Sequence, residues 1–120
     1  MMKAYLQKCC DDHGWMGCVV VGGDGLLLMS VGHGLDDGCT ALLPSWLSAG
    51  EGIAMQGDLN GMSCCCMMPK NKSAMILAWS VDVTANETLY FAIRTRHIPK
   101  QVITVLEKIG KDIRSILYHE

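Results

Sequence analysis

The sequence lacks the features that mark a membrane, secreted or disordered protein. Among its 120 residues, no apolar run approaches the roughly 20 residues that a membrane-spanning helix needs. Residues 1–5 lack the apolar block of a secretory signal peptide. Only 18% of the residues are charged and 50% are hydrophobic, which excludes a disordered chain. We therefore expect a soluble, cytoplasmic protein that folds as a single domain over residues 1–120.

The motifs that commonly bind nucleotides or metals are also missing. The glycine-rich stretch 22–25 lies between two strand-like apolar segments, whereas a phosphate-binding loop opens onto a helix. No two cysteines have the C-x₂-C spacing typical of zinc and iron–sulfur sites. The four histidines are scattered along the chain. We expect no catalytic residue, no metal and no cofactor.

The charge pattern does not indicate a nucleic-acid-binding protein. The formal net charge is −2. Residues 1–93 carry nine acids and four bases, and residues 94–120 carry three acids and six bases. This asymmetry predicts a mildly electropositive C-terminal helix, far from the strongly basic composition of most nucleic-acid binders.

Residues 73–119 predict two strands and a long helix at the centre of the fold. Residues 74–81 form a continuous apolar run, and residues 89–96 are rich in aromatic and β-branched side chains. Pro99 suits the first turn of a helix. An apolar stripe follows at helical spacing: Val102, Leu106, Ile109, Ile113 and Ile116. The strands and the helix are expected to bury their apolar faces against each other.

The first half of the chain predicts a helix, a hairpin and a second helix. Residues 2–13 have an amphipathic pattern, and Gly14 can end that helix in a left-handed turn. The apolar runs on either side of residues 22–25 predict a β-hairpin. Residues 38–59 read as a helix that becomes regular near Leu43, because Pro44 is tolerated only in a first turn. The predicted fold class is α/β (α+β), with a single five-stranded, mainly antiparallel sheet flanked by helices in the order α-β-β-α-β-β-β-α.

Residues 62–68 are predicted to form an outer strand whose free edge can pair with another chain. Their short connection to residues 73–81 predicts an antiparallel meander with 62–68 at one edge. This segment carries no charge, and an apolar free edge is an aggregation hazard. We therefore expect it to pair with the same strand of a second copy, or of a paralogue, across a two-fold axis. The predicted dimer interface consists of Met62, Cys64, Cys65, Cys66 and Met68, with Trp46 and Ile53 from the preceding helix.

These features together resemble the roadblock/dynein light chain family. The matching features are the segment GCVVVGGDGLLL at 17–28, the helix through residues 42–54, and the closing strand and helix from Leu89. The resemblance implies a longin-like α/β sandwich and a dimer whose sheet continues through the third strand. It also implies a non-catalytic module that binds a small Ras-like GTPase and regulates or scaffolds it.

Seven cysteines leave an alternative function open. Without an export signal they are expected to be thiols, and Cys64 and Cys66 point to one face of the predicted strand. With His33 or Cys39 arriving from a loop, they could hold zinc or an iron–sulfur cluster. A small profilin-, PAS- or GAF-like domain could sense a ligand, a metal or a redox signal in this way, and a thiol enzyme is a third possibility. We expect the thiols to pack as small hydrophobic groups.

One basic cluster is a candidate partner-binding site. Arg94, Arg96 and Lys100 lie close together in the sequence beside His97. They could meet an acidic partner surface or supply an arginine to a GTPase site, and they could equally be a solvated strand end. The roadblock resemblance provides no arginine with an assigned role.

Overall fold

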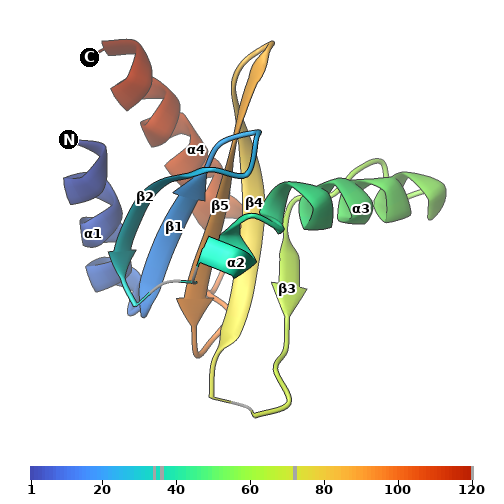
Figure 1. The fold of residues 1–120 in the computed structure, drawn as a ribbon, viewed down its shortest axis with the longest axis horizontal. Helices are drawn as coiled ribbons and strands as arrows, with labels where there is room; N and C mark the ends of the chain where they lie inside the picture. The colour runs from blue at the N-terminus through green and yellow to red at the C-terminus, as the bar shows by residue number, and fades with distance from the viewer. Residues whose placement is uncertain (34, 36, 72, 120) are drawn as a thin grey trace.

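The computed structural model describes residues 1–33, 35, 37–71 and 73–119. The chain forms helix α1 (Met2–His13), strands β1 (Gly17–Val21) and β2 (Leu27–Gly32), helices α2 (Asp37–Thr40) and α3 (Leu43–Gln56), strands β3 (Cys65–Met67), β4 (Met75–Thr84) and β5 (Glu87–Thr95), and helix α4 (Val102–His119). This order confirms the predicted one, with the short α2 added before α3 (Figure 1). Over the described residues, no helix combines the length and the apolar character that a membrane crossing requires.

The five strands form one sheet in the order β2-β1-β5-β4-β3, and every neighbouring pair is antiparallel. The predicted fold class is therefore confirmed. Strands β3, β4 and β5 form the predicted meander. The N-terminal hairpin joins the sheet on the far side of β5, so β3 remains an outer edge, and no element among the described residues pairs beyond it. Strand β2 forms the opposite edge, and a bulge shifts its register beside Val21.

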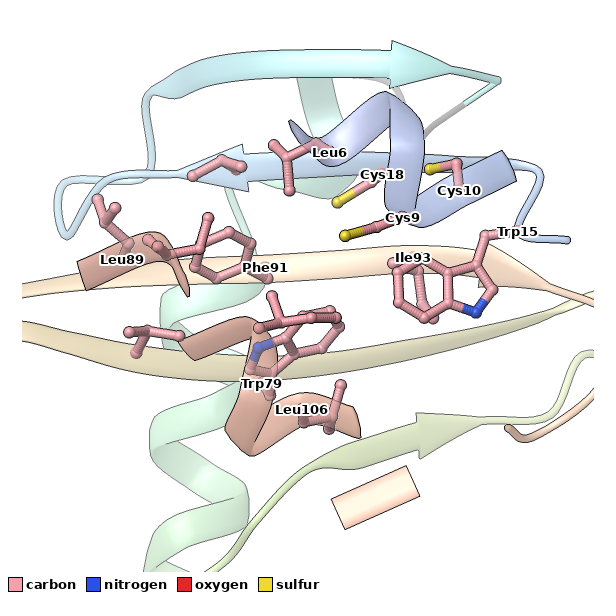
Figure 2. Packing of buried hydrophobic residues seen from close by; sticks show 14 of the residues in the cluster. Leu6, Cys9, Cys10, Trp15, Cys18, Trp79, Leu89, Phe91, Ile93 and Leu106 are labelled. Atoms are coloured by element: carbon pink, nitrogen blue, oxygen red, sulfur yellow. The ribbon is translucent and has the colours of Figure 1, made fainter. Parts of the chain in front are cut away.

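Helices cover both faces of the sheet, and β1 shows how the strands serve both layers. Cys18 and Val20 belong to the core on the side of α1 and α4, whereas Val19 and Val21 belong to the core under α3. All four side chains are buried, which explains the continuous apolar run in the sequence. In the larger core, Trp79 stacks on Phe91 with ring centroids 5.5 Å apart and an angle of 12° between the ring planes (Figure 2).

The helix boundaries follow from glycine and proline. Helix α1 ends at Gly14, whose φ of 69° lies in the left-handed region, as predicted. Helix α3 begins at Leu43 with Pro44 in its first turn, also as predicted. The predicted start of α4 at Pro99 is wrong, because the regular helix begins at Val102. Gln101 has a φ of 53° and cannot continue a right-handed helix backwards toward Pro99.

The predicted strand 62–68 is also too long, since β3 spans only Cys65–Met67. The cause lies in α3. The backbone N–H of Met62 donates to Glu51 Oε2 at 3.0 Å, and this hydrogen bond holds the chain before β3 toward the helix. Residues 62–64 therefore do not pair with β4, and β4 runs on to Thr84 without a β3 neighbour beyond Ala78.

Candidate interaction surfaces

The edge formed by β3 and the end of α3 exposes several large apolar side chains. Helix α3 crosses the sheet and extends past β3 (Figure 1). Ile53 on α3 is 72% exposed, Leu59 after α3 is 71% exposed, and Met68 after β3 is 69% exposed. Met67 on β3 and Cys66 are exposed as well. Exposed apolar side chains beside an unpaired strand are typical of a surface that another protein covers.

The predicted interface residues divide into two groups. Ile53, Cys66 and Met68 are exposed and available for contact. The other four residues are half-buried and pack within the chain: Trp46, Met62 and Cys65 against the core under α3, and Cys64 against the core under α1 and α4. The dimer interface remains a prediction, and fewer of its predicted residues are exposed than the sequence indicates.

Gly50 allows α3 to approach β3 closely. A Cβ atom at Gly50 would lie 2.6 Å from Met62 Sδ and 2.7 Å from Cys65 Sγ, both far inside van der Waals contact. The two sulfur atoms are themselves 2.9 Å apart. Since Glu51 binds the Met62 backbone next to this contact, α3 and the segment before β3 form one packed unit.

Cys64 and Cys65, where β3 begins, pack against different parts of the chain. Cys64 and Cys65 lie on opposite sides of the sheet. Across the described part of the chain, no three His, Cys, Asp or Glu side chains are grouped so that they could hold a metal ion. Burial raises the pKa of the Cys64 and Cys65 thiols, and it raises the pKa of Cys10 to about 11. These thiols stay protonated at neutral pH, which makes them poor nucleophiles.

The basic cluster lies where β5 ends. Arg94 is half-buried in β5, and its backbone oxygen accepts a hydrogen bond from Met16 N at 2.7 Å. Arg96 and Lys100 are exposed in the connection to α4. The Thr95 hydroxyl donates to the backbone oxygen of His97 at 2.9 Å and orders the start of this connection. The cluster is therefore accessible, with Arg94 the most restrained of its members.

A second apolar surface was not predicted from the sequence. Leu26 and Leu28 at the β1–β2 turn are exposed, and so is Leu42 just before α3. A Cβ atom at Gly25 would lie 3.2 Å from the backbone oxygen of Ala41, which places the turn against the start of α3. The sequence held a signal for this surface, because three consecutive leucines follow the Asp-Gly turn. An edge strand buries apolar side chains on only one of its faces, so such a run leaves leucine side chains exposed.

A hydrogen-bonded network joins the two helices on the other face of the sheet. The Tyr5 hydroxyl on α1 donates to Asp112 Oδ2 on α4 at 2.7 Å, and Lys108 Nζ lies 3.2 Å from the same oxygen. The hydrogen bond from Tyr5 and the neighbouring lysine lower the pKa of Asp112. Burial and the adjacent carboxylate raise the pKa of Tyr5, so the phenol remains a donor.

Comparison with known proteins identifies the fold. No protein-family model matches the sequence, and no curated protein is significantly similar to it. Among solved structures, MglB from Myxococcus xanthus has a TM-score of 0.72 at 15% identity and covers 99% of this chain and 96% of its own. A Roadblock/LC7 domain from Streptomyces avermitilis has a TM-score of 0.60 at 20% identity, covering 87% of this chain and 86% of its own. LokiProfilin1, solved with rabbit actin, has a TM-score of 0.58 at 12% identity, covering 96% and 95%. The predicted roadblock, longin-like fold is confirmed.

Proposed function

From the roadblock fold, we propose that this chain is a non-catalytic, dimeric interaction module that binds a small Ras-like GTPase and regulates or scaffolds it. The observation that carries the proposal is the exposed apolar edge at β3 and α3, on a chain that superposes over nearly its whole length on MglB. The GTPase as partner rests on what the roadblock resemblance implies.

The first step of the proposal is self-association through β3. The strand is uncharged, no strand in the described part of the chain pairs with its outer side, and Met67 and Met68 are exposed there. Pairing with the same strand of a second copy would satisfy the free backbone groups of this edge. Ile53 and Leu59 would contribute apolar area at the same seam, because α3 extends past β3.

Size-exclusion chromatography with light scattering tests this step. The unmodified chain is expected to be a dimer in reducing buffer. The double substitution Ile53→Glu with Met68→Glu places two charges in the seam and should yield a monomer, because buried unpaired charges are strongly unfavourable. Ile98→Glu is the matched control, since Ile98 is also exposed but lies beyond β5. A monomeric unmodified chain, or equal dissociation of the Ile98→Glu control, would refute the β3 seam.

The second step is recognition of the GTPase. Arg94, Arg96 and Lys100 are the candidate contact, because an accessible basic cluster suits an acidic partner surface. Small Ras-like GTPases from the same genome, loaded with a non-hydrolysable GTP analogue or with GDP, can be tested by biolayer interferometry. We expect binding to one of them, weakened by Arg96→Glu and Lys100→Glu. If none binds in either nucleotide state, the GTPase assignment fails while the dimer can still stand.

A further inference from the structure

A cleft opens where the chain before β3 leaves the sheet. Strand β3 pairs with β4 only at residues 76–78, and a hydrogen bond from Met62 N to Glu51 Oε2 holds the Met62 backbone beside α3. Beyond Ala78, none of the strands that the structure describes pairs with the outer edge of β4. Between this edge and α4 lies a cleft of about 470 Å³, lined in part by Met62, Trp79, Ser80, Leu106, Lys111 and Arg114.

Trp79 forms an apolar wall of the cleft and has an unused hydrogen-bond donor. The residue is only 3% exposed, and Figure 2 shows its ring beside Leu106 of α4. Within the described residues, its indole N–H has no acceptor. A buried donor without an acceptor is unfavourable, and a native protein normally pairs it with a protein group, water or a ligand.

The rim of the cleft carries two cations, Lys111 and Arg114, and two carboxylates, Asp82 and Glu107. Lys111 and Arg114 are three residues apart on α4 and both line the cleft. The salt bridge found among the described residues joins Lys108 to Asp112, and neither rim cation takes part in one. The carboxylate of Asp82, which also lines the cleft, accepts the Thr88 hydroxyl at 2.8 Å.

Side chains of α4 donate hydrogen bonds to backbone oxygens at the C-terminal end of β4. Arg114 Nη1 donates to the backbone oxygen of Asp82 at 3.4 Å, and the Tyr118 hydroxyl donates to that of Val83 at 2.8 Å. The part of the edge with neither β3 nor an α4 side chain on it is therefore residues 79–81. This length suits a short added strand, whereas a helical ligand has no free backbone groups to offer there.

We propose that the cleft binds an extended, acidic segment of a partner protein. The segment adds as a short strand to β4 at residues 79–81 and brings carbonyl acceptors next to Trp79. Its acidic side chain lies between Lys111 and Arg114, where a carboxylate can accept charge-assisted hydrogen bonds. Glu107 lies one turn before Lys111 and disfavours a second carboxylate at that end of the cleft. The proposal does not rest on the GTPase assignment.

Fluorescence anisotropy with a labelled hexapeptide of alternating valine and glutamate tests this inference on the full chain. We expect saturable binding. The double substitution Lys111→Gln with Arg114→Gln should weaken it about tenfold or more, because two charged contacts are lost. Lys3→Gln with Lys8→Gln is the control, since these exposed lysines on α1 change the net charge equally. Trp79→Phe keeps an aromatic ring against Phe91, removes the N–H, and should weaken binding about fivefold.

Three further probes decide whether the ligand is an extended acidic peptide. A valine–lysine hexapeptide should not bind, and a valine–glutamate peptide with N-methylated backbone amides should lose affinity because it cannot add as a strand. Glutarate should not displace the peptide. The proposal is overturned if the acidic peptide fails to bind at about 1 mM, or if both double variants weaken it equally. It is also overturned if the N-methylated peptide binds unchanged, or if glutarate competes as well as the peptide does.

Discussion

Two glycines in α3 should respond in opposite directions to the same substitution. Gly50→Ala and Gly52→Ala each remove a glycine from a helix interior, which alone stabilises a helix by about 0.5–1 kcal/mol. At Gly52 a new Cβ has no neighbour within 4 Å, so this gain should appear in full. At Gly50 the Cβ would overlap Met62 Sδ and Cys65 Sγ. Overpacking of this kind costs about 1–3 kcal/mol, and the net effect should be a loss of about 1 kcal/mol.

Urea denaturation monitored by circular dichroism, at one fixed protein concentration, measures both changes. Gly52→Ala should raise the midpoint and Gly50→Ala should lower it. The Cys65→Ala background is the diagnostic control, because it removes one of the two sulfur atoms that the new Cβ meets. In that background Gly50→Ala should cost less, giving a favourable coupling between the two sites. If both glycine substitutions stabilise the chain equally, α3 does not approach β3 as described.

Two more predictions concern α1 and the thiols. Tyr5→Phe should lower the free energy of unfolding at pH 7 by about 1 kcal/mol, because the Asp112 carboxylate, a charged acceptor, loses the hydrogen bond that the Tyr5 hydroxyl donates. The lowered pKa of Asp112 contributes stability above its unfolded pKa, near 3.8, and this contribution is lost as the pH falls through the folded pKa. Thermal melts from pH 7 to pH 3 should therefore show a smaller acid-induced loss for Tyr5→Phe than for the unmodified chain. In the native state, iodoacetamide should label exposed Cys66 well before buried Cys18, because burial also raises the pKa of the Cys18 thiol. Mass spectrometry of peptides gives the order of labelling. Equal labelling rates would contradict the described packing.

Local patterns were sufficient for most of the fold. Gly14, the Asp-Gly turn after β1 and Pro44 each act on the backbone within a few residues, and the structure has the predicted boundary at each of them. The edge position of β3 followed from short connections. These features could be predicted because their causes lie next to their effects in the sequence.

The misplaced features depend on contacts between distant residues. Strand β3 is short because Glu51, eleven residues before Met62, binds its backbone N–H. Strand alternation predicted that Cys64 and Cys65 point to opposite faces, but which core each one enters depends on the distant helices that cover those faces. The cleft needs β4 and α4 together, so neither Trp79 nor Lys111 stood out before the two elements were placed side by side.

The bulge in β2 has a consequence for how far such a sheet can grow. A sheet with two open edges can in principle polymerise, one copy after another, into a filament. The two edges here are unlike: β3 is short and regular, whereas the bulge beside Val21 interrupts the register of β2 and twists that edge. Pairing of β3 with β3 would occupy the regular edge of both copies. The irregular β2 edges would then lie at the two ends of the joined sheet. If β3 pairs with β3 as proposed, association through this sheet therefore stops at two copies.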